Sequence, residues 1–362
     1  MVTALIFFGV LFLLILVHEW GHYIVAKKVG MKVEEFGIGF PPKLFGYKKG
    51  ETEYTFNLFP IGGFVRIYGE NPEEVVEGND KERSFSARPR WAQALVLIAG
   101  VTMNIILAWV LFIAVFVIGS PTAVSEDDAG QDAALTVVSL SPESPAQNVI
   151  PLGATITNIG YENETFTIET PSQLAEVISG SGGNVLEIAY IHNDERQTAT
   201  VAPVQGLIEG DEERYAIGVQ TVLIEYVSYG VIESAVLAFK RTVEMLVLIV
   251  TSIAGLLYST VAGQADFSQV AGPIGIYNLV GDAAAIGIVS LMVFTAVISL
   301  NLAVINLFPF PALDGGRLII VAIESVIRRD IDPIWVGRLN LVGFLILIAL
   351  MIAVTYNDII RL

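Results

Sequence analysis

The sequence predicts a polytopic α-helical membrane protein that carries one β-rich domain outside the bilayer. Of its 362 residues, 54% are hydrophobic and only 16% are charged, whereas soluble domains contain about 25% charged residues. Several separate apolar runs are long enough to cross a bilayer, which takes about 20 residues per helix. The remaining length leaves room for one extramembrane domain of roughly 100 residues.

The charged residues are distributed unevenly along the chain, whose net charge is −17. Residues 27–90 contain eleven Lys and Arg residues, whereas residues 120–230 contain two, against seventeen Asp and Glu residues. Because cytoplasmic loops carry the excess of Lys and Arg, the first region is predicted to be cytoplasmic and the second to lie outside a cell (inner) membrane. The acidic exterior argues against nucleic acid as a partner. The absence of cysteine excludes disulfides and thiolate metal sites.

The first predicted transmembrane helix, residues 1–30, contains the motif His18-Glu19-Trp20-Gly21-His22. Positions i and i+4 lie on one face of a helix, so His18 and His22 can bind one metal ion together. Glu19 is adjacent and can accept a proton from water, as in the H-E-x-x-H motif of zinc peptidases. The motif also occurs by chance in soluble helices, but no structural reason places three ionisable groups inside an apolar span. A cleaved signal peptide is not expected, because the segment has no basic n-region.

Residues 31–90 are predicted to form a cytoplasmic, membrane-associated β-hairpin region followed by a linker. Apolar and polar residues alternate in the first part, and turn signals at Pro41-Pro42, Gly46 and Gly62-Gly63 interrupt them. We expect hairpins that dip toward the membrane face near the metal, and an ordinary cytoplasmic loop is the alternative. Residues 71–90 are polar and acidic, which favours a linker.

Residues 91–119 form the second predicted transmembrane helix. Because the preceding region is cytoplasmic, this helix returns the chain to the outer side. Asn104 is polar within it, and such an asparagine is as often a helix-packing contact as part of a site.

Residues 132–222 are predicted to form the exterior domain, a small β-rich unit with one short helix. Strand-like alternation recurs from Leu135 onward, and Thr170-Pro171 marks the start of a helix over residues 172–178. The unit resembles a PDZ domain of the bacterial protease type, because Ser144-Pro145-Ala146 follows that pattern. Gly153-Ala154 departs from it, since the family usually has Gly-Asp there, so a site for peptide carboxylates is not implied.

The last third of the chain is predicted to contain one unusual helical segment and two further spans. Residues 231–265 are predicted to form an amphipathic or re-entrant helical segment, which includes an apolar stretch over residues 245–262. The third transmembrane segment covers residues 286–316, and an amphipathic cytoplasmic interfacial helix covers residues 317–333. The fourth transmembrane helix covers residues 334–357.

A catalytic zinc site needs a third protein ligand and an open position for water. The stretch from Asn306 to Gly316 supplies a carboxylate, Asp314, at the end of an apolar span. Pro309 and Pro311 break the helix before it, and the glycines after it allow a close approach of the backbone. Asp314 is therefore the candidate ligand, and the alternative is that it only caps the following helix.

The position of Asp314 constrains the predicted topology. Asp314 must reach the metal on the cytoplasmic side at a ligand distance of about 2 Å. If residues 245–262 crossed the bilayer in addition to residues 286–307, Asp314 would emerge on the outer side. The sequence therefore predicts four spans with both termini outside. Residues 245–262 would lie on the outer interface, or enter the membrane and return.

Two motifs together resemble those of a known family. H-E-x-x-H starting at His18 and N-x-x-P-x-P-x-L-D-G starting at Asn306 resemble the site-2 protease family of intramembrane zinc metalloproteases, in particular the bacterial regulator-of-sigma-E protease type. Residues 60–70, Ala99-Gly100 with Asn104, and residues 271–276 agree with the same family. Val101 departs from it, because the family commonly has proline at that position.

The resemblance implies a role for each candidate site residue. These are His18, His22 and Asp314 as Zn2+ ligands, Glu19 as the catalytic base, and Asn306 as the residue that holds the substrate backbone. A helical substrate must unwind before it is cleaved, and its freed backbone groups then need partners away from lipid. We expect the hairpin around Gly62 and Gly63 to provide them by strand addition.

The predicted activity is zinc endopeptidase cleavage within transmembrane segments, as in the regulated intramembrane proteolysis of anti-sigma factors or signal-peptide remnants. The predicted partners are single-span transmembrane substrates, an upstream site-1-type protease and membrane lipid. The alternative is a membrane metal-ion or solute transporter with a midplane site. A transporter would favour paired repeats, which the sequence lacks, and would leave Glu19 without a role.

Overall fold

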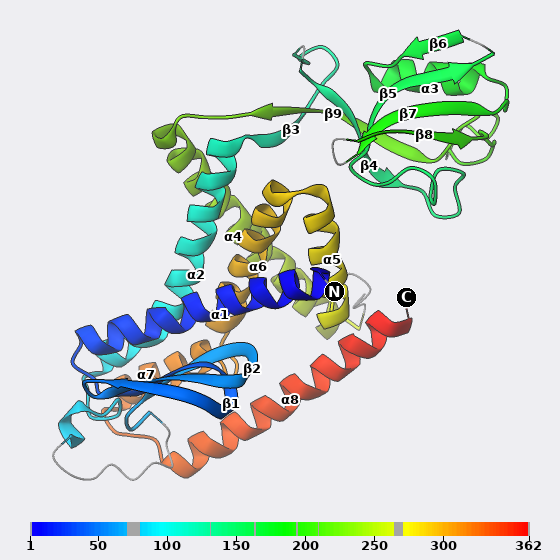
Figure 1. Ribbon diagram of the computed structural model, residues 1–362. Helices are drawn as coiled ribbons and strands as arrows, with labels where there is room; N and C mark the ends of the chain where they lie inside the picture. The colour runs from blue at the N-terminus through cyan, green and yellow to red at the C-terminus, as the bar shows by residue number, and fades with distance from the viewer. Residues whose placement is uncertain are drawn as a thin grey trace. The chain divides into compact units, whose positions relative to one another are not determined.

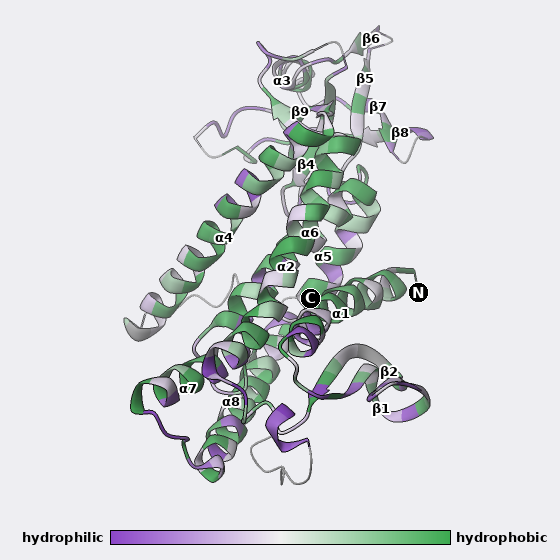
Figure 2. Ribbon diagram, turned by 90° about the vertical axis from the view of Figure 1, so that its left-hand side faces the viewer, coloured by the Kyte–Doolittle hydropathy of each residue, from purple (hydrophilic) through white to green (hydrophobic). Residues whose placement is uncertain are grey.

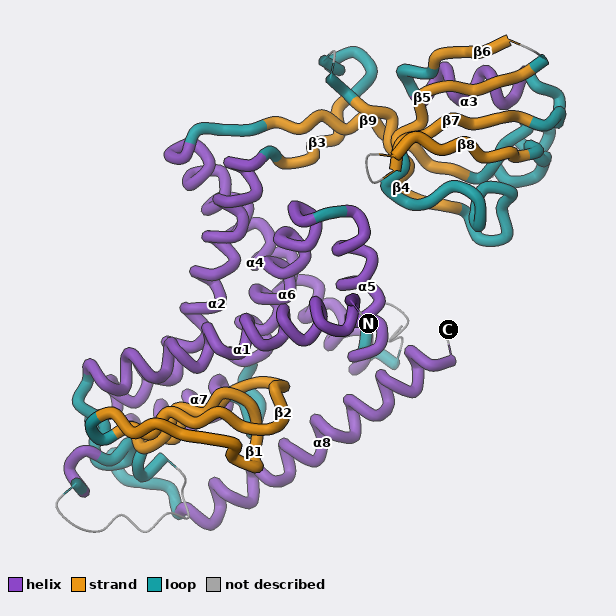
Figure 3. The backbone as a smooth tube through the Cα atoms, viewed as in Figure 1, coloured by secondary structure: helices purple, strands orange, loops and turns teal. Residues whose placement is uncertain are grey.

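The computed structural model describes residues 2–70, 80–130, 132–162, 164–192, 195–208, 210–263 and 271–360. The chain divides into two compact units, which are Met1–Val115 with Val231–Leu362, and Phe116–Gly230. The first unit consists of helices and one folded hairpin, whereas the second is a β-sheet with one helix (Figures 1 and 3).

Long apolar helices form most of the first unit, and Figure 2 shows hydrophobic residues along their whole lengths. Among the described residues, five helices are long and apolar enough to cross a membrane. The helices associated with this unit are α1 (Val2–Lys28), α2 (Arg90–Ile118), α4 (Val231–Val261), α5 (Pro273–Ile286), α6 (Ile288–Leu307), α7 (Asp314–Ile327) and α8 (Pro333–Ile360). All except α5 and α7 are the five candidate spans.

The segment that joins α4 to α6 differs from the prediction. α5 is a separate helix of 14 residues that the sequence analysis did not identify. Gly287 separates it from α6 with a φ of 137°, a conformation that glycine adopts readily. Because α5 lies between them, α4 and α6 alone do not determine the side on which Asp314 emerges.

The hairpin of the first unit consists of β1 (Val33–Lys49) and β2 (Thr52–Ile67). It folds on itself, because residues 33–38 pair both with residues 63–67 and with residues 53–56. A buried apolar cluster joins the base of this hairpin to α1, α2 and α7. Its members are Ala26, Met31, Val33, Ile67, Phe85, Ala92, Val96, Leu97 and Val321.

The second half of the predicted linker packs against this cluster. Residues 71–79 lie outside the described residues, but Phe85 is only 5% exposed. The backbone N–H of Phe85 donates to the carbonyl of Tyr68 at 2.8 Å, and Lys32 pairs with Asp80 at 2.9 Å. The polar composition of residues 71–90 predicted a linker. The buried ring of Phe85 and these contacts attach the described part of this segment to the hairpin.

The second unit is a single sheet with strand order β3-β9-β4-β5-β7-β8, and β6 pairs with β5. It extends beyond the predicted limits at both ends, because β3 and β9 pair with each other. The elements are β3 (Ser120–Val124), β4 (Ala134–Leu140), β5 (Thr155–Tyr161), β6 (Glu164–Thr167), α3 (Pro171–Gly180), β7 (Leu186–His192), β8 (Glu195–Val201) and β9 (Val219–Val227).

Helix α3 begins where the sequence predicts. The hydroxyl of Thr170 accepts a hydrogen bond from the backbone N–H of Gln173, and Pro171 occupies the first turn. Leu174 and Ile178 are buried and join an apolar core that β4, β5, β7, β8 and β9 also supply. The sheet therefore has one continuous hydrophobic core beneath its helix.

Candidate metal centre

Two glycines bring the histidine face of α1 close to α2. His18 and His22 are 7% and 9% exposed. A Cβ atom on Gly21 would lie 2.5 Å from the backbone oxygen of Ala99, and one on Gly100 would lie 2.4 Å from His22 Nε2. Both distances are below van der Waals contact, so only glycine permits this approach of the two helices.

A broken segment between α6 and α7 positions Asp314. Ala312 has a φ of 74° in this segment, and a Cβ atom on Gly315 would lie 2.2 Å from the backbone oxygen of Leu307. Asp314 is the first residue of α7, and Leu313 is the N-cap, with no side-chain capping bond. The alternative that Asp314 only caps the helix is therefore wrong: its side chain points toward the histidines instead.

The three predicted ligand atoms form a nearly equilateral triangle. His18 Nε2 lies 3.1 Å from His22 Nε2, and Asp314 Oδ2 lies 3.2 Å from the former and 3.4 Å from the latter. A tetrahedral zinc with ligands at about 2.0–2.1 Å separates its ligand atoms by about 3.3 Å. Asp314 Oδ2 is also buried without a hydrogen-bond partner. The residues present therefore fit a zinc ion bound by two imidazoles and one carboxylate.

The second ring nitrogens of both histidines contact α2. His22 Nδ1 lies 2.8 Å from the backbone oxygen of Val96. His18 Nδ1 lies 3.3 Å from the side-chain amide of Asn104, which is fully buried. The sequence left the role of Asn104 open. Its spacing of eight residues from Val96, two helical turns, is the signal that both belong to the same face.

The remaining predicted site residues surround this triangle. Asn306 Nδ2 lies 3.4 Å from His18 Nε2. Glu19 occupies the next position of α1 after His18. A Cβ atom on Gly63 would lie 3.8 Å from Glu19 Cγ, and one on Gly62 would lie 3.4 Å from a side-chain carbon of Ile15 on α1. The structure thus brings β2 alongside the turn of α1 that carries the motif.

Arg317 is a site-supporting residue that the sequence analysis did not identify. It lies one turn after Asp314, and its Nη1 is 2.5 Å from Glu70 Oε1, just after the end of β2. Its guanidinium also lies 4.8 Å from the ring centroid of Phe85. Arg317 therefore attaches the first turn of α7 to the hairpin region. Its position directly after Asp314-Gly315-Gly316 is the feature of the sequence that could have indicated a role near the site.

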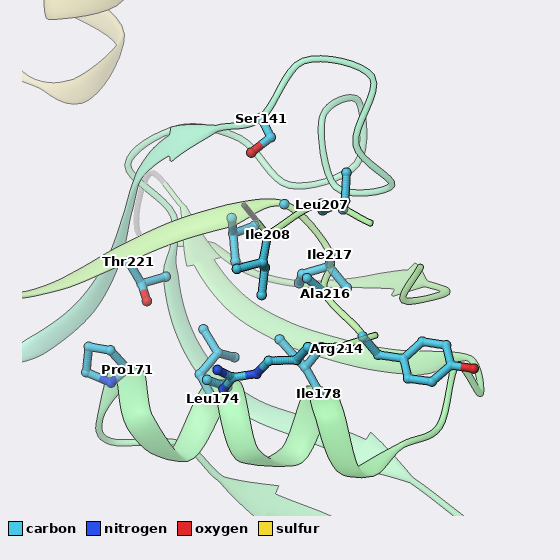
Figure 4. Close-up of a pocket in the computed structure, with 14 residues that line it drawn as sticks. Ser141, Pro171, Leu174, Ile178, Leu207, Ile208, Arg214, Ala216, Ile217 and Thr221 are labelled. Atoms are coloured by element: carbon cyan, nitrogen blue, oxygen red, sulfur yellow. The ribbon is translucent and has the colours of Figure 1, made fainter. Parts of the chain in front are cut away.

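The second unit has a pocket of its own, which contains none of the predicted site residues. Figure 4 shows the side chains of α3 on one side, among them Leu174 and Ile178, and the segment around Ile217 on the other. Leu207, Ile208 and Arg214 also line it. The pocket is thus largely apolar with a single cation.

Comparisons with known proteins agree with this geometry. Residues 6–350 match the model of Peptidase family M50. A putative zinc metalloprotease of Clostridium perfringens is 37% identical over 96% of this chain and 95% of its own length. The zinc metalloprotease RasP of Oceanobacillus iheyensis is 30% identical over 100% of this chain and 99% of its own length. The PDZ domain of an SdrC-like protein from Listeria monocytogenes matches 26% of this chain and 92% of that domain, with 20% identity and a TM-score of 0.22.

Fold, site and relatives define a multi-pass membrane metalloprotease that carries a β-rich domain. The chain belongs to Peptidase family M50, the site-2 protease family, and is a zinc metalloprotease. The predicted family, enzyme class and cofactor are thereby confirmed.

Proposed function

We propose that the protein is an intramembrane endopeptidase, which hydrolyses peptide bonds within transmembrane segments of single-span membrane proteins. The observation that carries this proposal is the convergence of His18, His22 and Asp314 inside an apolar helical unit. His18 lies about 15 residues along α1, roughly 22 Å from its start. Hydrolysis at that depth acts on a peptide bond within the hydrocarbon layer.

In this proposal His18, His22 and Asp314 hold the zinc ion, which supplies Lewis acidity that activates water and polarises the scissile carbonyl. Glu19 accepts the proton of the attacking water and delivers it to the leaving amine. Its side chain lies on the side of α1 next to β2, where a Cβ atom on Gly63 would be 3.8 Å from Glu19 Cγ. Asn306, 3.4 Å from His18 Nε2, is placed to donate its amide hydrogens to the substrate backbone.

The edge of the folded hairpin is the proposed substrate-binding element. Residues 63–67 pair with residues 33–38 on one side only, within the described pairing. A substrate helix that unwinds exposes backbone groups that lipid does not satisfy. Addition of the unwound segment as a further strand beside Gly62 and Gly63 satisfies those groups. It also brings the segment next to Glu19.

The exterior unit is proposed to act as a filter. Its pocket and the surrounding surface would exclude substrates whose outer portions are large. An upstream site-1-type protease would therefore trim such substrates first. Anti-sigma factors and signal-peptide remnants are substrates of this kind, because each has one span and a short outer portion after trimming. Contact with membrane lipid follows from the apolar surface of the helices.

Four spans, with the termini and the exterior unit outside and residues 31–90 in the cytoplasm, remain the proposed topology. The ring of Phe7 packs against that of Tyr277 at 5.5 Å between centroids, and Asp358 accepts hydrogen bonds from the N–H groups of Gly272 and Gly275. The start of α5 thus contacts the start of α1 and the end of α8, which are the ends assigned to the outer side. A chain that is outside both before α4 and at the start of α5 supports a segment between them that does not cross the membrane.

Single cysteines test this topology cleanly, because the chain has none of its own. Cysteines at Ser228 and at Ser268, which lies outside the described residues, should react with impermeant thiol reagents from outside. A cysteine at Ser325 should react only after permeabilisation. Labelling of Ser228 and Ser268 from opposite sides would show that α4 crosses, and the four-span topology would be wrong.

The catalytic proposal is tested by comparing zinc content and cleavage in matched variants. Glu19→Gln should keep its zinc and lose cleavage of a model transmembrane substrate by a factor of about 10²–10⁴, because only the base is removed. His18→Ala, His22→Ala and Asp314→Ala should lose both zinc and cleavage. Wild-type turnover in Glu19→Gln would exclude its role as base, and full zinc in Asp314→Ala would exclude that ligand.

A further inference from the structure

Helix α2 contacts both histidine rings at Nδ1, the ring nitrogen that does not face Asp314. Val96, Gly100 and Asn104 are spaced by four residues and therefore lie along one face of α2. Val96 contacts the far nitrogen of His22, Asn104 contacts the far nitrogen of His18, and Gly100 makes room for both rings. The two rings are thus held by equivalent contacts, one through a backbone oxygen and one through a side-chain amide.

The chemistry of the ligands determines what each contact must be. A neutral imidazole that binds metal through Nε2 carries its proton on Nδ1, and that proton is usually donated to a carbonyl or carboxylate oxygen. The Val96 carbonyl is such an acceptor for His22. His18 needs an acceptor at the same place, and the group 3.3 Å away is the Asn104 amide.

The oxygen of that amide has no other partner. Asn104 is 0% exposed, and its Oδ1 is buried without a hydrogen bond. An unpaired buried acceptor costs about 1–3 kcal/mol. A half-turn about the Cβ–Cγ bond exchanges the positions of Oδ1 and Nδ2, which brings the oxygen opposite His18 Nδ1 and gives it a donor.

We propose that Asn104 is a positioning residue, which accepts the Nδ1–H proton of His18 and so keeps Nε2 unprotonated and directed at the zinc. The inference rests on the proposed role of His18 as a ligand. It assigns the polar residue of the second span to the metal centre rather than to helix packing. Asn104 touches neither substrate nor zinc and acts only through the ring of His18.

A neighbouring contact provides the matched control. Ser299 on α6 donates its hydroxyl to the backbone oxygen of Asn104 at 2.8 Å, and both residues are fully buried. Ser299→Ala removes a hydrogen bond at the same helix contact without changing the side chain that faces His18. An effect of packing alone would appear in this variant as well.

The experiment measures zinc affinity of the purified full-length protein by competition with a chromophoric chelator. Asn104→Leu should lower the affinity 10–100-fold, as is typical when the partner of a ligating histidine is removed. Asn104→Asp, which keeps an acceptor oxygen, should stay within about threefold of the wild type, and Ser299→Ala should not differ from it. In the cobalt-loaded protein, Asn104→Leu should also change the visible absorption spectrum, whereas Ser299→Ala should leave it unchanged.

The inference is overturned if Asn104→Leu binds zinc as tightly as the wild type, or if Ser299→Ala weakens binding equally. It is also overturned if Asn104→Asp is as weak as Asn104→Leu. If Asn104→Leu does not fold, Asn104→Ala takes its place in the same assay. His18→Ala separates the two proposals, because retention of zinc there would contradict the metal assignment itself.

Discussion

The two units of the molecule differ in where they place polar and apolar residues. The hydrophobic core of the β-rich unit is formed by side chains such as Leu135, Leu186 and Ile188, which are at most 2% exposed. The interior of the helical unit contains the polar side chains of His18 and Asn104 in addition to its apolar cluster. Its surface carries the large apolar side chains, and the residues of α8 from Phe344 to Ile346 are more than half exposed.

The solvent explains this difference. In water, burial of apolar surface stabilises a fold by about 25 cal/mol per Å², so the β-rich unit places its apolar residues inside. Lipid is as apolar as leucine, so helices in a membrane associate through close packing of small residues and through polar contacts. The helical unit therefore depends on close spacing at Gly21 and Gly100, whereas the β-rich unit depends on buried area.

The largest expected effect comes from adding one methyl group to the helical unit. In Gly100→Ala the new Cβ would lie 2.4 Å from His22 Nε2 and 2.7 Å from His18 Cε1, so the rings must move and the ligand triangle opens. Zinc measured by mass spectrometry should fall to a few per cent of the wild type, and proteolysis with it. Gly9→Ala on α1 is the control, because no atom lies within 4 Å of its added Cβ. Full zinc in Gly100→Ala would show that α1 and α2 can separate without cost.

A loss of buried area in the β-rich unit should affect that unit alone. Leu186 is 0% exposed, so Leu186→Ala should destabilise this unit by about 2–5 kcal/mol. Hydrogen exchange of the β7 and β8 amides should become faster, while zinc content stays at the wild-type level. Val185→Ala, whose side chain is 60% exposed, should change stability by less than about 0.5 kcal/mol. Loss of zinc in Leu186→Ala would mean that the metal centre requires the β-rich unit.

The smallest effect is expected where the helical unit meets water. Hydrogen bonds from Arg83 and Lys27 lower the pKa of Glu51 from 4.5 to about 2. Because the folded-state pKa is depressed, this contribution is complete above about pH 4.5 and is lost as the pH falls toward 2. The pair is partly exposed, so its contribution should be below about 1 kcal/mol. Melting temperatures between pH 6 and 3 should fall less steeply for Glu51→Gln than for the wild type. Equal slopes would show that Glu51 contributes nothing.

Local patterns predicted much of this protein. The period of a helix places His18 and His22 on one face, and two prolines before Asp314 interrupt the span that carries it. Thr170 and Pro171 start α3 where capping preferences predict. In each case the information lies within a few residues, where backbone geometry and solvent alone determine the outcome.

Other features were decided only by tertiary contacts. The sequence did not predict α5 as a separate helix. Residues on both sides of Gly287 are apolar, so hydropathy alone does not show that one helix ends and another begins there. In the sequence Phe85 belongs to a polar linker, and only the structure shows its contact with the hairpin. The sequence likewise gives no partner for Arg317, which the structure pairs with Glu70. Asn104 lies 86 residues from His18 and Asn306 lies 288 residues from it. Spacing along the chain does not predict which helices meet, because that depends on which faces pack closely enough, as Gly21 and Gly100 permit here.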